Sequence, residues 1–420
     1  MKILVIEQPL NNRGDESAHR GLMMKLIQEY PDVQIKVLFY GRKDKEINEF
    51  KVIARQIEYV NIPFDATTRR YFGRVIKSLM ILNMPYFLYL LPKIRIMLRF
   101  YREADYILCA PGGMNMGGFQ DWIHQAFLNL AMYEHKKVIY YGRSIGPFPE
   151  TTYLNRLFKK NSERLLKYFS YLSLRDAKSQ LIAKSLRIKY TPTIDSAFLI
   201  ETKSEMPHSF VKEMNGDPYI VFVPNSLAWH KNFKSYSFDD INFFWITLLD
   251  NLAESYPEHK IVMLPQTIGY SKLLPDGYIY FNEIKSQSVF SDRVFVLDEQ
   301  YGSDIQQTII SKASFLIGAR YHSVIFSINQ AVPFISLSYE HKMNGVVEIL
   351  GKKDCEIDLV EEFANQPISD ILQSDLIERI VKKTQALNSI KDTQKLAHDI
   401  ANDGFEELKI FINNLSTHRK

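Results

Sequence analysis

Short apolar runs that alternate with helical stretches constrain the fold of this chain more than any other feature. In the first half these runs are residues 2–6, 34–40, 106–110, 137–141 and 171–174. In the second half they are residues 219–223, 260–264, 293–297, 313–317 and 332–337. Near-continuous apolar strands that alternate with helices predict parallel sheets covered on both faces. Two such series in tandem predict an α/β protein with two Rossmann-like domains whose parallel sheets face a cleft.

The domain boundaries follow from length and from local breaks in periodicity. A chain of 420 residues is too long for one ordinary core. Residues 201–218 contain two prolines and a glycine and fit neither a helix nor a strand, which is typical of a linker. We therefore predict an N-terminal domain over residues 1–205 and a C-terminal domain over residues 216–365. Residues 366–420 have apolar positions at helical spacing, which predicts helices that pack on the body.

Composition excludes several classes of protein. A net charge of +4 gives no general argument for nucleic-acid binding. Cys109 and Cys355 lie far apart and outside any CxxC spacing, so neither disulfides nor a zinc site is expected. The histidines show no metal-binding pattern, and we predict no metal site and no cofactor. The first residues, MKILVIEQ, become polar too soon for a secretory signal, which favours a cytoplasmic protein.

One segment has a strongly biased charge. Residues 69–102 contain eight lysines and arginines and no acidic residue, within an insertion of about residues 66–104. Pro85 and Pro92 interrupt its apolar stretch, so a membrane-spanning helix is not expected. Two interpretations stay open. The segment is either a helical insertion whose arginines extend from a packed face, or a surface for peripheral contact with an anionic membrane.

The sequences IGARYH and YEHK follow two predicted strands and bring together an arginine, a histidine and a lysine. The carboxyl ends of parallel strands are where α/β proteins bind ligands. Arg320 can bind a carboxylate or phosphate with two hydrogen bonds, Lys342 supplies a charge, and His322 can move a proton near neutral pH. The three predict a site for a small polyanion that undergoes proton-dependent chemistry. The alternative is an exposed basic loop with a histidine that only satisfies a backbone carbonyl.

The sequence NNRGDES follows the first strand and enters a helix. Glycine suits a tight turn, and acidic residues suit the first turn of a helix, so a structural explanation accounts for much of the motif. In the functional interpretation, Asn12 and Asp15 point into the cleft and bind sugar hydroxyls or accept a proton.

Further glycines and polar residues lie at the same predicted sheet edges. Gly112 and Gly113 follow one strand, Arg143 lies in YYGRSIGP after the next, and Gln266 lies in LPQT. Glycine allows a ligand to approach the backbone closely. The alternatives are a purely structural turn for Gly112 and Gly113, a surface position for Arg143, and a polar loop for Gln266. Together these residues are candidates for binding a ligand.

Arg175 ends the strand YLSLRD beside Asp176. Such a pair often forms an ion pair and caps the next helix, which begins at Asp176. If Arg175 instead turns inward, it projects into the cleft toward Arg320 and His322.

Taken in order, several short motifs resemble those of the polysaccharide pyruvyltransferase family. They are NRGDES, PGG, GRSIGP, SLRD, PTIDSAF, PQT, GARYHS and YEHK, spread over about residues 3–350. The resemblance implies two Rossmann-like domains in a glycosyltransferase-B-like arrangement. It also implies transfer of the enolpyruvyl group of phosphoenolpyruvate to two hydroxyls of a sugar, which forms a ketal during bacterial surface polysaccharide synthesis.

The resemblance also assigns roles. It makes Arg175, His322 and Lys342 the catalytic and donor-binding residues, and adds Arg320 and Gly318 to the donor site. The acceptor it implies is a sugar, with a lipid-linked oligosaccharide at the inner membrane face as one form. The candidates for binding that acceptor are Asn12, Asp15, Gly112, Gly113, Arg143 and Gln266. The chain departs from the usual family pattern at Arg143, where GQGIGP is common, in the EQPLN lead-in, and at Glu340, where aspartate is usual. A sugar-nucleotide glycosyltransferase of the same architecture is the alternative, and a non-catalytic lipid-binding protein is a third.

Overall fold

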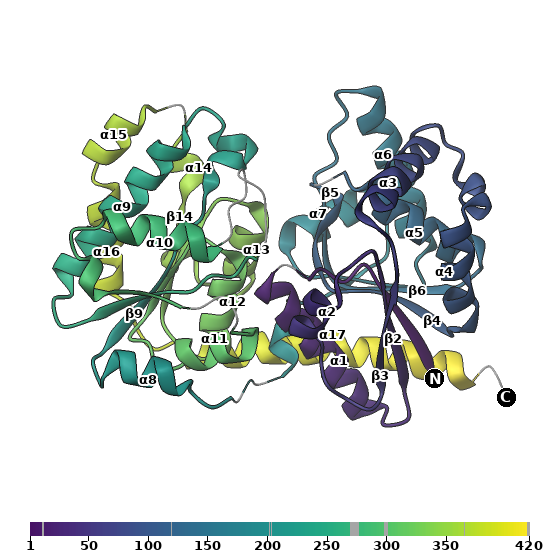
Figure 1. Ribbon diagram of the computed structural model, residues 1–420, viewed down its shortest axis with the longest axis horizontal. Coiled ribbons are helices and arrows are strands. Elements are labelled where there is room, and N and C mark those ends of the chain that lie inside the picture. The colour runs from purple at the N-terminus through teal and green to yellow at the C-terminus, as the bar shows by residue number, and fades with distance from the viewer. Residues whose placement is uncertain are drawn as a thin grey trace. The chain divides into compact units, whose positions relative to one another are not determined.

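The computed structural model describes residues 1–417, except 11, 119, 201, 203, 269–276, 298–300 and 365. The chain divides into two compact units. Unit 1 comprises Met1–Leu10, Ala18–Ile200 and Ile400–Lys420, and unit 2 comprises Asn11–Ser17 and Glu201–Asp399. Each has its own parallel sheet with helices packed on it (Figure 1).

The sheet of unit 1 contains eight strands among the described residues, in the order β3-β2-β1-β4-β6-β7-β8, with β5 paired to β6. Its strands are β1 (Lys2–Ile6), β2 (Gln34–Tyr40), β3 (Ile57–Ile62), β4 (Tyr106–Cys109), β5 (Gly112–Gly117), β6 (Lys137–Gly146), β7 (Tyr171–Leu174) and β8 (Thr191–Pro192). Its helices are α1 (Arg13–Glu29), α2 (Asp44–Phe50), α3 (Ala66–Ile81), η1 (Pro85–Leu90), α4 (Pro92–Glu103), α5 (Trp122–Tyr133), α6 (Tyr153–Tyr168), α7 (Ala177–Ser185) and η2 (Ser196–Leu199).

Successive side chains along each strand point to opposite faces of this sheet, and helices pack on both faces. Leu4, Ile107 and Tyr140 lie in one core with apolar residues of α3, α4, α5 and α6. Tyr141 and Tyr171 point the other way and contact Phe405 and Phe411 of α17 (Lys391–Thr417). The buried strands therefore need apolar residues at nearly every position, which is why they read as continuous apolar runs.

The sheet of unit 2 contains six strands among the described residues, in the order β11-β10-β9-β12-β13-β14, and every pair is parallel. Its strands are β9 (Tyr219–Val223), β10 (Lys260–Met263), β11 (Val294–Val296), β12 (Leu316–Gly318), β13 (Phe334–Ser338) and β14 (Glu356–Asp358). Its helices are α8 (His208–Met214), η3 (Leu227–Trp229), η4 (Lys231–Phe233), α9 (Phe238–Ser255), α10 (Gly277–Gln287), η5 (Ser291–Arg293), α11 (Ser303–Ile310), α12 (Tyr321–Asn329), α13 (His341–Ile349), η6 (Lys353–Cys355), α14 (Leu359–Glu362), α15 (Ile368–Gln373) and α16 (Leu376–Gln385).

The observed division differs from the predicted domains in two places. The first turn of α1 belongs to unit 2, although the strand before it belongs to unit 1. The last turns of α17 belong to unit 1, whereas the rest of the C-terminal helices belong to unit 2. The predicted linker at residues 201–218 also contains a helix, α8, whose Phe210 packs on Tyr219 and Phe295.

Among the described residues, no helix is both long enough and apolar enough to cross a bilayer. The basic insertion forms α3, η1 and α4, with residues such as Phe72, Leu88 and Leu98 in the core of unit 1.

Candidate active site

The site in unit 2 is built at the carboxyl ends of two neighbouring strands. β12 pairs in parallel with β13, so Gly318 lies beside Ser336. Each of the two strands is followed by a helix that begins at the same edge of the sheet. Arg320 immediately precedes α12, and Glu340 immediately precedes α13. His322 and Lys342 are therefore each the second residue of their helices. Two helix N-termini that open at one sheet edge favour an anionic ligand through their unpaired N–H groups and their dipoles.

Aromatic and ionic contacts connect these residues. The rings of Tyr321 and His322 lie 4.8 Å apart, nearly perpendicular to each other. The Lys342 Nζ atom lies 5.8 Å from the centroid of the Tyr321 ring and 2.9 Å from an oxygen of Glu340. The structure thus brings His322 and Lys342 next to the same tyrosine.

Glu340 balances the charge of Lys342. Burial alone would raise the pKa of the Glu340 carboxyl, but Lys342 holds the pKa below its ordinary value, so the carboxylate stays charged at neutral pH. His230 adds to this group, because its ring lies 5.5 Å from the ring of Tyr339 and it acts electrostatically on Glu340. Burial lowers the pKa of His230. No sequence motif contains His230, so the sequence gives no signal that it belongs to this group.

Arg320 is partly exposed at this edge. Burial raises the pKa of both Tyr280 and Tyr339, and the charge of Arg320 opposes this rise at both tyrosines. Gly318, the last residue of β12, has a packing role of its own. A Cβ there would lie 2.2 Å from Oγ of Ser323, so only glycine lets α12 approach the strand.

The motif NRGDES lies against His322. A Cβ on Gly14 would lie 1.8 Å from Nδ1 and 1.9 Å from Cγ of His322. The imidazole thus packs directly on the backbone of Gly14, and any side chain there would displace the ring. Asn12 supports this backbone, because its Oδ1 accepts a hydrogen bond of 2.8 Å from the Gly14 N–H.

The same turn is anchored to loops of unit 2. The N–H of Arg13 donates to the carbonyl of Gln266 at 2.9 Å, and Asn12 forms a β-bridge with Thr267. The buried Glu16 carboxylate pairs with Arg13 at 3.0 Å and accepts hydrogen bonds from the N–H and hydroxyl of Ser303 at the start of α11. Neither Arg13 nor Glu16 was proposed as a site residue from the sequence, because Gln266 and Ser303, to which they connect, lie hundreds of residues away.

The structure also places the predicted acceptor residues. Asp15 is partly exposed in the first turn of α1. The Gln266 side chain is buried, and the backbone carbonyl of Gln266 accepts the hydrogen bond from the Arg13 N–H. Both lie in unit 2 with His322. Gly112, Gly113 and Arg143 lie in unit 1, where Arg143 is buried and donates to the carbonyl of Ala110 and, at 2.8 Å, to Oδ1 of Asn115. The expectation that a surface arginine explains Arg143 is wrong, because only 1% of its area is exposed.

Arg175 also lies in unit 1 and is 1% exposed. Its guanidinium forms an ion pair with buried Asp195 and donates from Nε to Ser144 Oγ at 3.2 Å. Asp176 caps α7 as predicted, by accepting the Ser179 N–H at 2.8 Å. The carboxylate that holds Arg175 is therefore Asp195 from the PTIDSAF motif, and a role for Arg175 toward the donor remains a prediction.

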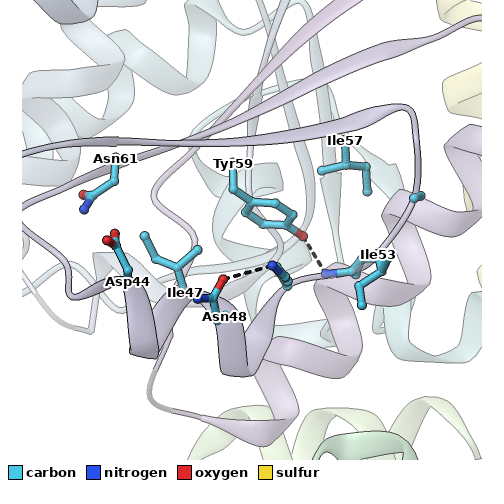
Figure 2. A pocket seen from close by; sticks show the side chains of 10 residues that line it. Asp44, Ile47, Asn48, Ile53, Ile57, Tyr59 and Asn61 are labelled. Atoms are coloured by element: carbon cyan, nitrogen blue, oxygen red, sulfur yellow. Dashed lines mark hydrogen bonds between the residues drawn. The ribbon is translucent and has the colours of Figure 1, made fainter.

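A separate pocket of about 490 Å³ lies between α2 and β3 in unit 1 (Figure 2). Its polar groups are largely occupied, since the Val52 N–H donates to the Tyr59 hydroxyl at 2.7 Å and Lys51 donates to Asn48 at 2.9 Å. It contains none of the predicted site residues, and nothing in its lining points to chemistry.

Comparison with known proteins identifies the family. Residues 23–341 match the sequence profile of the family described as polysaccharide pyruvyl transferase. The chain belongs to the polysaccharide pyruvyl transferase family. The match ends one residue before Lys342 and begins after NRGDES, so contacts in the structure, rather than the profile, connect those two segments to His322.

A curated relative agrees with this assignment. The amylovoran biosynthesis protein AmsJ of Erwinia amylovora is 22% identical over 237 residues, which cover 54% of this chain and 55% of that protein. The match thus spans about half the length of the relative. The name of this relative places that protein in amylovoran biosynthesis.

Solved structures show the fold. The UDP-N-acetylglucosamine 2-epimerase of Methanocaldococcus jannaschii superposes with a TM-score of 0.57 at 12% identity, covering 98% of this chain and 100% of that one. MnaA of S. aureus gives 0.57 at 12% identity over 98% and 97% of the two chains. The trehalose-6-phosphate synthase OtsA gives 0.54 at 9% over 98% and 99%. The fold is therefore of the glycosyltransferase-B type, as predicted.

Proposed function

We propose that this protein transfers the enolpyruvyl group of phosphoenolpyruvate to two hydroxyls of a sugar and so forms a pyruvyl ketal. The observation that supports the proposal most directly is the arrangement at the edge of the unit 2 sheet. There, His322 and Lys342 lie in the first turns of two adjacent helices and share Tyr321 as a neighbour. Phosphoenolpyruvate carries a carboxylate and a phosphate, and two helix N-termini with Arg320 and Lys342 are suited to that pair of anions.

The reaction needs proton movement but no redox step. A proton adds to the methylene carbon of phosphoenolpyruvate and makes C2 electrophilic. One sugar hydroxyl then adds to C2, the C2–O bond to phosphate breaks, and the second hydroxyl adds in its place. The two hydroxyl protons balance the reaction, since one ends on the new methyl group and the other on the released phosphate.

In the proposed mechanism His322 delivers the proton to the methylene carbon. An imidazole can both give and regain a proton. The backbone of Gly14 and the ring of Tyr321 both contact the imidazole and limit its movement. Arg320 and Lys342 hold the anionic groups and stabilise the phosphate as it leaves.

The test is mass spectrometry of a panel of sugar acceptors incubated with phosphoenolpyruvate and the whole protein. We expect the mass increase of one pyruvyl ketal on an acceptor, together with release of phosphate. His322→Ala should abolish transfer, whereas His208→Ala, which changes an exposed histidine at the start of α8, should leave it unchanged. Near wild-type transfer by a folded His322→Ala protein would refute the role of His322.

A sugar-nucleotide-dependent glycosyltransferase is the second candidate, because proteins of similar fold include a structure of S. aureus MnaA with UDP. Only a ligand of the native state raises its unfolding temperature. A shift with phosphoenolpyruvate but not with UDP-sugars supports the pyruvyltransferase, and the reverse result supports the glycosyltransferase.

A further inference from the structure

The basic insertion of unit 1 exposes an unusual share of the large apolar side chains. Among the described residues nineteen such side chains are exposed, and seven of them lie within residues 71–96. Five of the seven fall between the end of α3 and the end of η1; they are Leu82, Met84, Tyr86, Phe87 and Leu90. We call these five residues the apolar patch. Apolar residues scattered singly over a surface need no explanation, whereas a cluster of them marks a site of interaction.

The geometry of η1 gathers most of the apolar patch on one face. Side chains three residues apart lie over one another in a 3₁₀ helix. Phe87 and Leu90, together with Met84 at the N-cap, therefore share one face, and all three are exposed. Pro85 and Leu88 share another face, which is buried. Because the buried face already supplies the contacts of η1 with the core, the exposed face is left to a partner.

Most of the cations in the basic insertion have no ion pair. Residues 69–102 contain eight lysines and arginines and no acidic residue. Three of the eight have partners within the fold, since Arg69 and Lys93 donate to backbone carbonyls and Arg102 pairs with Glu134 at 2.8 Å. The other five are exposed and form no ion pair with any described residue; they are Arg70, Arg74, Lys77, Arg95 and Arg99.

The spacing of these cations works against the stability of the free protein. Arg70 and Arg74 are four residues apart on α3, and Arg95 and Arg99 are four residues apart on α4. Residues at this spacing are neighbours on the surface of a helix, and two like charges placed there destabilise it. The folded chain therefore gains nothing from these pairs, whereas an external anion would be attracted by both members of each pair.

Arg95 connects the cations to the apolar patch. Its guanidinium donates to the carbonyl of Leu90 at 3.2 Å, so a positive charge lies directly beside a residue of the patch. Ile96, the next residue of α4, is also exposed and lies three residues before Arg99 on the same helix. Apolar side chains and positive charges are thus interleaved where η1 joins α4.

The combination of charge and apolar surface selects the partner. Leu82, Met84 and Leu90 offer a nucleic-acid base neither a hydrogen bond nor an aromatic ring, but acyl chains accept such side chains. A second copy of this chain that used the same surface would bring its own cations against these, and like charges repel. Anionic phospholipids supply the opposite charge, and a tyrosine such as Tyr86 is typical of the boundary between membrane and water.

We propose that the apolar patch and the five cations without ion pairs dock this protein on the surface of a bilayer that contains anionic phospholipid. Leu82, Phe87 and Leu90 enter the boundary between headgroups and acyl chains, and the cations contact lipid phosphates. The docking requires neither a donor nor an acceptor substrate, so its test is independent of the proposed function.

Sedimentation with vesicles tests the apolar patch. We expect the wild-type protein to bind vesicles of phosphatidylglycerol mixed with phosphatidylcholine, to bind more weakly at high salt, and not to bind phosphatidylcholine alone. The patch variant is Leu82→Ser/Phe87→Ser/Leu90→Ser, and its control, which changes exposed apolar residues elsewhere, is Ile53→Ser/Ile279→Ser/Val289→Ser. The patch variant should bind at least about tenfold more weakly, because it buries less apolar surface, and the control should bind like wild type. Equal sedimentation of the two variants would overturn the inference.

A second pair of variants tests the cations at matched net charge. Arg70→Gln/Arg74→Gln/Lys77→Gln removes three charges from α3, and the control Lys160→Gln/Lys184→Gln/Lys189→Gln removes three exposed charges elsewhere in unit 1. Each cation held at an anionic surface strengthens binding about fivefold, so the first variant should bind roughly 100-fold more weakly and the control much less so. Equal weakening would show attraction to the net charge alone and would overturn the assignment of this surface.

Fluorescence of Phe87→Trp measures insertion directly. With anionic vesicles the introduced indole should emit at shorter wavelength than in water, and lipids with brominated acyl chains should quench it. An indole that stays in water while the protein sediments would overturn the insertion. The changed side chains are all exposed, so every variant should unfold in urea like wild type. A lipid-free oligomer that only the patch variant dissociates would also overturn the inference, since the patch would then join copies of this chain.

Discussion

Replacing Gly14 with alanine tests the packing of His322 on the backbone of Gly14. The new Cβ would lie 1.8 Å from Nδ1 and 1.9 Å from Cγ of His322. Nonbonded carbon contacts are normally about 3.5 Å or longer, so the ring must withdraw by roughly 1.5 Å. A displacement of about 1 Å at a reacting group can lower the rate about 100-fold. We therefore expect kcat for pyruvyl transfer to fall at least about 100-fold, or ~2.7 kcal/mol in the barrier.

The effect on stability should be smaller. Overpacking a filled site costs about 1–3 kcal/mol, and alanine recovers about 1 kcal/mol over glycine within a helix. The matched control is Gly73→Ala in α3, where a Cβ would meet Ile123 at an ordinary 3.4 Å. That variant should be as active as wild type.

The assay is release of phosphate from phosphoenolpyruvate with an accepted sugar, combined with unfolding in urea. If Gly14→Ala acts through His322, the double variant Gly14→Ala/His322→Ala should be no slower than His322→Ala. A folded Gly14→Ala protein with wild-type kcat would refute the reasoning, because the ring could then move without effect.

Three further predictions concern charged groups. Glu340→Gln removes the carboxylate paired with Lys342, so phosphoenolpyruvate should bind severalfold more tightly and with stronger salt dependence; an unchanged Kd in calorimetry would contradict this. Arg175→Met leaves the buried Asp195 without its ion pair to Arg175 and should lower the unfolding free energy by about 3–5 kcal/mol. The double variant Arg175→Met/Asp195→Leu should restore that free energy. If the double variant still binds phosphoenolpyruvate, Arg175 is not a donor ligand. Folding raises the pKa of Glu7 from 4.5 to about 7, so the protonated carboxyl stabilises the fold below pH 4.5 and this is lost as pH rises through about 7. As pH rises between those values, the unfolding free energy of Glu7→Gln should therefore increase by up to ~3 kcal/mol relative to that of the wild-type protein. A difference between the two proteins in urea unfolding that does not change with pH would contradict the raised pKa.

The sheet edge in unit 2 could be predicted from the sequence because its determinants are local. Apolar runs identify strands, parallel strands place their carboxyl ends together, and Arg320 and Lys342 follow two such runs directly. The strand bounds moved by a few residues, from 313–317 to Leu316–Gly318 and from 332–337 to Phe334–Ser338, without altering this conclusion.

Contacts between distant segments could not be predicted. Gly14 was explained equally well by turn geometry, because nothing near it in sequence reveals that His322 needs its space. Arg175 has Asp176 beside it, yet side-chain direction at the strand end sends it to Asp195. Glu7 and His124 belong to no motif, and only the packing of α5 on the sheet brings the Glu7 carboxyl to 3.7 Å from Nδ1 of His124.

The membership of residues Asn11–Ser17 in unit 2 has a practical consequence for dividing this protein into fragments. A fragment cut at the apparent linker would keep His322, Arg320 and Lys342 but lose Gly14 and the Glu16 anchor at Ser303. Such a fragment should bind anions without holding its histidine in place. Unit 2 cannot be expressed as one continuous stretch of gene, and a domain exchange between relatives must carry the start of α1 with it.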